Sequence, residues 1–178
     1  MVDGEIEVNL EQQAREFATK AHFGQTRKYN GVAYITHPEA VVALVRSVPH
    51  NEYTLAAAWL HDVAEDCGVS VKTLERQFGW TVANLVDWLT GVSKLSDGNR
   101  KIRKQLDLEH LAKAPAAAQT VKLADLIDNT SSIVKYDPEF AKVYLAEKRA
   151  LLEVLKEGDP TLWEKANEIV QLMDKETE

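Results

Sequence analysis

The sequence contains a single cysteine, Cys67, among its 178 residues. One cysteine excludes an internal disulfide and a zinc site built from several thiolates, and it favours a reducing, cytoplasmic location. No apolar run approaches the roughly 20 residues that a transmembrane helix needs; the best candidate is residues 56–60. Residues 1–5 are acidic and lack the basic and then apolar order of a signal peptide. We therefore expect a cytoplasmic protein with no membrane partner.

Basic residues are also fewer than acidic residues. The chain carries 21 Lys and Arg against 28 Asp and Glu, a formal net charge of −7. This balance argues against general nucleic-acid binding, so an anionic substrate would need a metal ion or a local basic patch. The hydrophobic fraction of 45% is ordinary for a soluble globular protein. The length suits one domain, residues 1–178, with a core that needs no covalent staples.

Glycine and proline are sparse, 8 and 5 residues, and they fall at the boundaries of periodic segments. Apolar residues recur at helical spacing almost throughout, and no window alternates convincingly with period two. The pattern predicts an all-α fold, a bundle of about eight to ten helices. The expected helices span residues 10–23, 38–45, 51–66, 70–79, 82–89, 97–113 and 115–135, followed by two helices within 138–176.

Helix starts carry their own signals. Asn9 and Asn51 are suited to cap the helices that follow them, and Asp137 and Asp159 each precede a proline at a first helical position. The apolar stripe of the two C-terminal helices has two interpretations, which stay open here: it completes the core, or it forms the face of a homo-oligomer.

Ionisable residues inside an apolar helix form the clearest functional pattern. Burying a charge without a partner is costly, yet His61, Asp62, Glu65 and Asp66 follow a strongly apolar run. His61 and Glu65 are four residues apart, as are Asp62 and Asp66, so we expect all of them on one broad face of a single helix.

Two further places repeat the pattern. Lys122, Asp125 and Asn129 share one helical stripe, and His37 stands just before Pro38 at the start of a helix. Imidazole with carboxylate is a ligand mixture that suits Mn²⁺, Fe²⁺ or Zn²⁺. A set of two histidines and two aspartates would leave positions open for water and substrate, as catalysis requires. That candidate metal set is His37, His61, Asp62 and Asp125.

The order His, then His-Asp, then Asp resembles the HD-domain phosphohydrolases. A longer likeness is narrower: residues 21–28, 31–38, 57–66 and 121–125, with Asn129, resemble the hydrolase domain of the RelA/SpoT homologues. The motifs occur in that family's order and cover roughly residues 10–135. By its length, the chain looks like a stand-alone small alarmone hydrolase.

The resemblance implies an α-helical domain with one Mn²⁺ that acts on a small nucleotide. It would remove the 3′-pyrophosphate of guanosine tetra- or pentaphosphate, giving GDP or GTP and pyrophosphate. Carried over by position, the four candidate ligands hold the metal, and Glu65 and Asp66 orient or deprotonate the attacking water. Arg27 and Lys28 lie over the nucleotide, and Asn129 helps to hold the nucleoside.

Substrate charge needs compensation as the transition state forms. Lys122 is a candidate for this role, and Arg100, Arg103 and Lys104 are candidates for reaching the 5′-phosphates. The competing interpretation of the basic run 100–104 is a solvated helix face, and Lys122 could equally well pair with Asp125 or Asp128.

The sequence also departs from the family pattern. Leu126 stands where the family often has a basic residue, and Asp128 where it often has an aromatic residue or histidine. These changes leave the nucleotide preference open. The alternatives are an HD phosphohydrolase acting on adenosine 3′-pyrophosphates, NADPH or a nucleoside phosphate, a nucleotide-binding regulator without catalysis, and a purely structural helical bundle.

Overall fold

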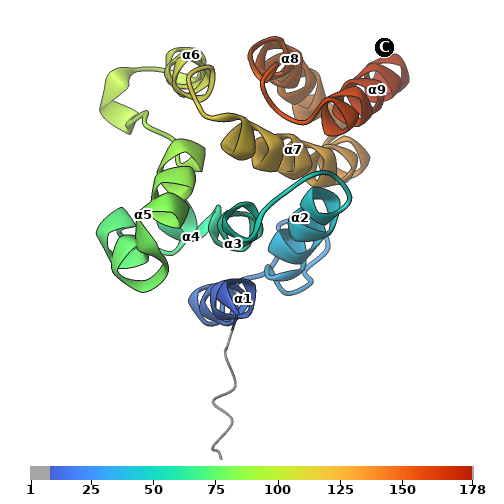
Figure 1. The fold of residues 1–178 in the computed structure, drawn as a ribbon. Helices are drawn as coiled ribbons and strands as arrows, with labels where there is room; N and C mark the ends of the chain where they lie inside the picture. The colour runs from blue at the N-terminus through green and yellow to red at the C-terminus, as the bar shows by residue number, and fades with distance from the viewer. Residues whose placement is uncertain (1–8, 178) are drawn as a thin grey trace, which may run out of the picture.

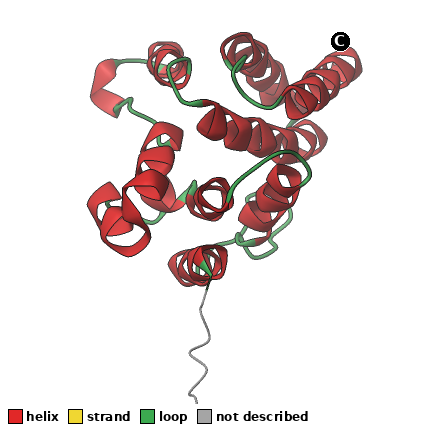
Figure 2. Cartoon of the chain, viewed as in Figure 1, coloured by secondary structure: helices red, strands yellow, loops and turns green. Residues whose placement is uncertain are grey.

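The structure, a computed structural model, describes residues 9–177. Residues 1–8 and 178, which the sequence analysis placed in the same domain, lie outside the described residues. The all-α prediction is confirmed, with nine α-helices and one short 3₁₀ helix over the described range (Figure 2). They are α1 (Leu10–Ala21), α2 (Thr36–Arg46), α3 (Glu52–Leu60), α4 (Val63–Asp66), α5 (Val71–Leu89), η1 (Leu95–Asp97), α6 (Arg100–Leu111), α7 (Ala116–Tyr136), α8 (Pro138–Val154) and α9 (Pro160–Thr177).

The predicted caps begin the helices as expected. The Asn9 and Asn51 side chains each accept a hydrogen bond from the backbone N–H three residues later, at 2.8 and 2.9 Å. Asp137 and Asp159 do the same at the starts of α8 and α9. Ser70 caps α5 in the same way, at 3.1 Å. Local sequence therefore determines where these helices start.

The predicted helices 70–79 and 82–89 form one element, α5, that is kinked at Gly79. The backbone of Gly79 has φ 82° and ψ 166°, a conformation that glycine adopts without a side-chain penalty. The two halves of α5 thus run in different directions around one side of α3 (Figure 1).

The prediction of one continuous helix over residues 51–66 is wrong. Helix α3 ends at Leu60, and α4 begins at Val63. Between them Asp62 has φ −101° and ψ −7°, a backbone region where active-site residues often lie. The Tyr34 hydroxyl donates a hydrogen bond to the Asp62 carboxylate at 2.6 Å, a contact from outside the helix at the position of the break. His61 and Asp62 therefore lie in a turn rather than on the face of a helix.

Helices α3 and α7 occupy the middle of the molecule (Figure 1). Helix α3 packs against α1, α2, α5 and α7, and residues 54–60 of it are all buried. Helix α7 contacts α2, α3, α5, α8 and α9. The C-terminal helices pack on α7 and on each other, and Leu151 and Leu155 join the main core. They complete the core, while a homo-oligomer stays a prediction.

None of the helices in the described part of the chain is long and apolar enough to cross a membrane.

Gln119, fully buried on α7, connects two loops. Its amide nitrogen donates to the carbonyls of Leu111 and Ala114, at 3.4 and 3.1 Å, and its carbonyl oxygen accepts from the Glu157 backbone at 3.0 Å. We predict that Gln119→Leu lowers the free energy of unfolding by about 3 kcal/mol, because buried backbone groups lose their partners. Urea denaturation measures this change.

The matched control is Gln77→Leu, the same substitution at an exposed position of α5. We expect it to change the free energy of unfolding by less than about 0.5 kcal/mol. Equal losses for the two variants would contradict the role given to Gln119.

Candidate metal centre

A short loop between α1 and α2 brings two side chains to the centre. The Arg27 backbone donates to the carbonyl of Val32 at 2.8 Å, and the Tyr34 backbone donates to the carbonyl of Gln25 at 2.9 Å. These bonds close the loop as a small hairpin. Arg27 and Tyr34 can then reach residues of α7 and of the turn between α3 and α4.

Three donor side chains converge where α2 meets the turn after α3. The Nε2 atoms of His37 and His61 lie 3.2 Å apart. The Asp62 Oδ2 atom is 3.1 Å from Nε2 of His61 and 3.5 Å from Nε2 of His37. One ligand atom from each residue lies within 4.8 Å of the others. His37, His61 and Asp62 thus form a group that can hold a divalent metal ion.

Asp125, the fourth predicted ligand, lies beside this group on α7. Its Oδ1 is 3.3 Å from Nε2 of His37. Its two oxygens also accept hydrogen bonds, Oδ1 from the Asn129 amide and Oδ2 from the Lys122 ammonium, each at 2.6 Å. Lys122 therefore pairs with Asp125, as one of its two interpretations predicted. The ligand role of Asp125 stays a prediction.

Each of the two imidazole rings is oriented by an oxygen atom close to its Nδ1 atom. The Nδ1 atom of His61 lies 2.7 Å from the carbonyl oxygen of Ala58, and that of His37 lies 2.7 Å from the Asp128 carboxylate. A carbonyl oxygen only accepts, so the proton of His61 belongs on Nδ1 and the lone pair on Nε2. This orientation is usual for metal-binding histidines, so the donor set fits a metal.

The electrostatics of the cluster also favour a cation. Burial opposes the positive charge of His37, but hydrogen bonds to Asp125, Asp128 and Asp62 outweigh it and raise its pKa to about 11. Burial likewise opposes the negative charge of Asp62, but His61 and His37 hold its pKa well below the ordinary range. The carboxylates around the two buried imidazoles stabilise positive charge there, which either protons or a metal ion can supply.

The predicted catalytic acids lie one turn further on, in α4. Both residues reach the surface, Asp66 with its carboxyl group partly buried. The Glu65 carboxylate accepts a hydrogen bond from the Gly91 backbone at 3.2 Å, which ties it to the end of α5. Burial and the neighbouring charge of Asp62 raise the pKa of Asp66. A raised pKa makes Asp66 a better proton acceptor than an ordinary aspartate.

The predicted substrate residues divide into two groups. Arg27 forms an ion pair with Asp128 at 2.7 Å and donates a hydrogen bond to the side-chain oxygen Oδ1 of Asn129 at 3.3 Å, so it joins the centre. Lys28 instead lies 3.9 Å from Asp137, with a side chain that is 75% exposed.

Two residues of the centre carried no predicted role. Tyr34 binds Asp62, and its position three residues before His37 was an available signal, because that spacing places both residues on one turn. Asp128 had been noted as a departure from the family pattern and as an alternative partner of Lys122. Its contact with His37 joins residues 91 positions apart, and no local spacing indicates it.

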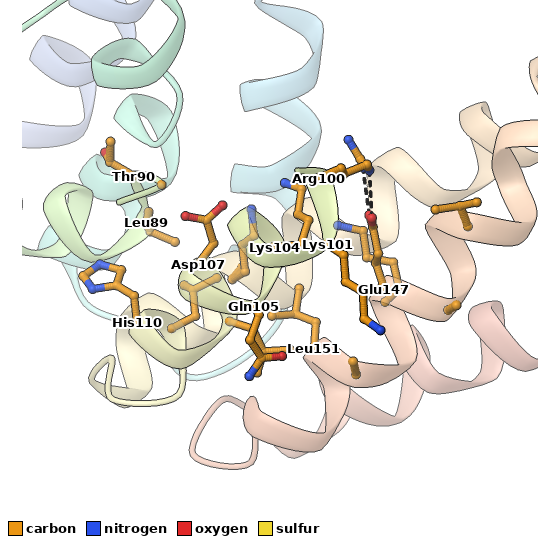
Figure 3. A pocket seen from close by; sticks show the side chains of 18 of the residues that line it. Leu89, Thr90, Arg100, Lys101, Lys104, Gln105, Asp107, His110, Glu147 and Leu151 are labelled. Carbon is orange, nitrogen blue, oxygen red and sulfur yellow. Dashed lines mark hydrogen bonds and ion pairs between the residues drawn. The ribbon is translucent and has the colours of Figure 1, made fainter. Parts of the chain in front are cut away.

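A cavity of about 770 Å³ opens next to the centre, between α6 and α8 (Figure 3). Glu65 and Lys122 line it and connect it to the centre. The other basic residues that line it are Arg100, Lys101, Lys104, Lys142 and Lys148. Arg103, the predicted contact, is not among the described residues that line the cavity. Arg100, Lys101 and Lys104 are exposed and also line the cavity, so both interpretations of the basic run 100–104 stay open.

Positive charge in the cavity is only partly balanced. Arg100 forms two hydrogen bonds of 2.8 Å with Glu147 (dashed lines, Figure 3). Lys148 is different: burial and the nearby Lys122 lower its pKa to about 8, and Lys104 adds to the effect. Cations that depress one another's protonation in this way favour an anionic ligand.

The shift at Lys148 can be measured by NMR titration of ¹³C-methylated lysines. We predict a midpoint of about 8 rather than the ordinary value of about 10.4, and a higher midpoint with inorganic pyrophosphate, because an anion favours the charged form. The unfolded chain binds more protons between these values, so the Lys148 contribution to stability rises with pH there. Lys148→Arg assigns the resonance; a midpoint near the ordinary value would contradict the account.

The sequence of this chain is similar to known proteins. Residues 14–154 match the family described as HD domain. The guanosine-3′,5′-bis(diphosphate) 3′-pyrophosphohydrolase of Vibrio cholerae is 37% identical over 141 residues, 76% of this chain and 19% of the relative. The bifunctional (p)ppGpp synthase/hydrolase SpoT of Escherichia coli is 36% identical over 141 residues, 76% of this chain and 20% of its own length. The chain thus spans about a fifth of the length of these relatives.

The fold has a solved counterpart as well. A structure of a metazoan SpoT ortholog that hydrolyzes ppGpp superposes with a TM-score of 0.82 at 28% sequence identity. The match covers 92% of this chain and 94% of that one. The family match includes all four candidate ligands, His37, His61, Asp62 and Asp125. The chain belongs to the HD-domain family.

Proposed function

We propose that this protein is a Mn²⁺-dependent pyrophosphohydrolase that removes the 3′-pyrophosphate of guanosine tetra- and pentaphosphate. The products would be GDP or GTP and pyrophosphate. The observation that carries the proposal is the junction of two features: a buried His and Asp cluster that can hold a divalent ion, and a basic cavity that meets it at Glu65 and Lys122. The activities of the relatives support the same reaction.

His37, His61, Asp62 and Asp125 would hold the metal, and their mixture of imidazole and carboxylate suits Mn²⁺. A bound divalent ion polarises a phosphoryl oxygen and lowers the pKa of water, which is the chemistry that hydrolysis of a diphosphate ester requires. Tyr34 supports this set, because its hydroxyl keeps Asp62 turned toward the two imidazoles.

Glu65 and Asp66 would act on the attacking water. Water would add to the phosphorus atom bonded to the ribose 3′-oxygen, one carboxylate would take its proton, and the bond between that phosphorus and the 3′-oxygen would break. The protonated carboxylate would then return the proton to the leaving 3′-oxygen. Asp66 is suited to the base role by its raised pKa, and Lys122 places positive charge beside the centre as negative charge develops.

The 5′-phosphates of the nucleotide would lie in the basic cavity. Arg27 and Asn129, which contact each other at the centre, would hold the nucleoside. We assign the 5′-phosphates to Lys104 and Lys148 rather than to Arg103, because those two line the cavity. Lys28, which lies toward Asp137, would have to turn to reach the substrate.

Product analysis tests the reaction. Purified protein with Mn²⁺ and guanosine tetraphosphate is expected to release GDP and pyrophosphate. Asp62→Ala removes a ligand, so we expect a loss of turnover of at least about 100-fold. Adenosine 3′-pyrophosphates and NADPH, tested in parallel, establish the nucleotide preference.

The control is Asp87→Ala, the same change at an exposed position of α5. It should retain full turnover. Guanosine tetraphosphate left intact by a protein that has bound Mn²⁺ would rule out the proposed activity, and binding without turnover would establish a nucleotide-binding regulator instead.

The cavity assignment generates a separate kinetic prediction. Lys104→Ala should raise KM for guanosine tetraphosphate about tenfold and leave kcat within about twofold, because a contact to the remote 5′-phosphates is made equally in the ground and transition states. Steady-state kinetics at fixed ionic strength measure both values.

Lys72→Ala, which removes an exposed lysine from α5, is the comparison and should leave KM unchanged. A fall in kcat at constant KM in Lys104→Ala would contradict the assignment, since it would place Lys104 in the chemical step.

A further inference from the structure

We propose that Asp128 is a positioning residue that fixes His37 as a metal ligand and ties Arg27 to the same centre. The inference rests on the metal site of the proposed function. A single carboxylate oxygen makes both contacts: Oδ2 of Asp128 lies 2.7 Å from Nδ1 of His37 and 2.7 Å from Nη1 of Arg27.

The contact with His37 orients its ring. The imidazole is buried, its Nδ1 faces Asp128, and its Nε2 faces Nε2 of His61 at 3.2 Å. A carboxylate at Nδ1 keeps the proton on that nitrogen and leaves the lone pair of Nε2 for a metal, and it increases the donor strength of the ring. Asp128 therefore acts on the metal through His37 rather than by contact with it.

The two histidines are held in different ways. His61 is oriented by the backbone carbonyl of Ala58, which no substitution removes. His37 depends on a side chain, so its orientation can be changed by one substitution. This difference makes Asp128 the point at which the geometry of the donor set can be tested without touching a ligand.

The contact with Arg27 extends the same network to the loop. The Arg27 and Asp128 side chains are 14% and 18% exposed, so their ion pair is largely shielded from water. Arg27 also donates to Asn129, whose amide donates to Asp125. The Arg27 guanidinium is thus linked by polar contacts to His37 through Asp128, and to Asp125 through Asn129. Loss of Asp128 would release the loop and the imidazole together.

The test is Mn²⁺ affinity, measured from the paramagnetic resonance signal of the free ion and independent of turnover. We expect Asp128→Ala to weaken binding by about 10- to 100-fold, the usual effect of removing a carboxylate behind a metal-bound histidine. Asp128→Asn should lose less, because its carbonyl oxygen still accepts the Nδ1 proton but carries no charge.

Asp107→Asn is the matched control. Asp107 is also a half-buried carboxylate that accepts hydrogen bonds, from the Val92 and Ser93 backbones, but it lies on α6 at the cavity. It should bind Mn²⁺ with wild-type affinity. Visible absorption of bound Co²⁺ gives a second measurement: the bands should shift in Asp128→Asn and stay unchanged in Asp107→Asn.

The outcomes separate this inference from the proposed function. Wild-type protein that binds Mn²⁺ and releases pyrophosphate, together with Asp128 variants that bind Mn²⁺ as tightly and give unshifted Co²⁺ bands, would overturn the role of Asp128 alone. Wild-type protein that binds no Mn²⁺ would overturn both. If Asp128→Ala fails to fold, the thermal melt shows it, and Asp128→Asn decides the question.

Discussion

The structure depends on the compensation of buried charge where α2, α3 and α7 meet. Two imidazoles and the Asp125 carboxylate lie almost entirely out of water, and isolated charges there would be costly. His61 is bonded to a backbone carbonyl of α3 and Asp125 to a lysine of its own helix, α7, whereas His37 on α2 has its carboxylate partner, Asp128, on α7. Helices α2 and α7 must therefore pack in one register, because a shift between them would leave the buried His37 without Asp128.

The helical architecture followed from the sequence because its causes are local. The 3.6-residue apolar period and caps such as Asn9, Asn51 and Asp137 act within a few residues of themselves. The break after Leu60 coincides with a distant contact, since Tyr34 binds Asp62 from 28 residues away. A strongly apolar segment with helical spacing gave no local indication of it, and the continuous helix predicted there was wrong.

The same distinction applies to the site. His61 and Asp62 could be found because charged residues stand out in an apolar run, and the helical stripe of Lys122 and Asp125 stood out for the same reason. Asp128 gave no such signal, because its contacts are made by the fold. Nor did Lys148, which lies on a helix whose packing the sequence left undecided, and whose importance comes from its neighbours in the cavity.

Lys122 belongs to both halves of the site, because it pairs with Asp125 and also lines the basic cavity. An ion that engaged Asp125 would compete for the carboxylate that now holds the ammonium group, and the freed charge would face the cavity. Occupation of the metal centre would then strengthen the attraction of the cavity for anions. By thermodynamic reciprocity, an anion in the cavity would favour the metal to the same degree. One lysine would thus make the loading of the two compartments cooperative.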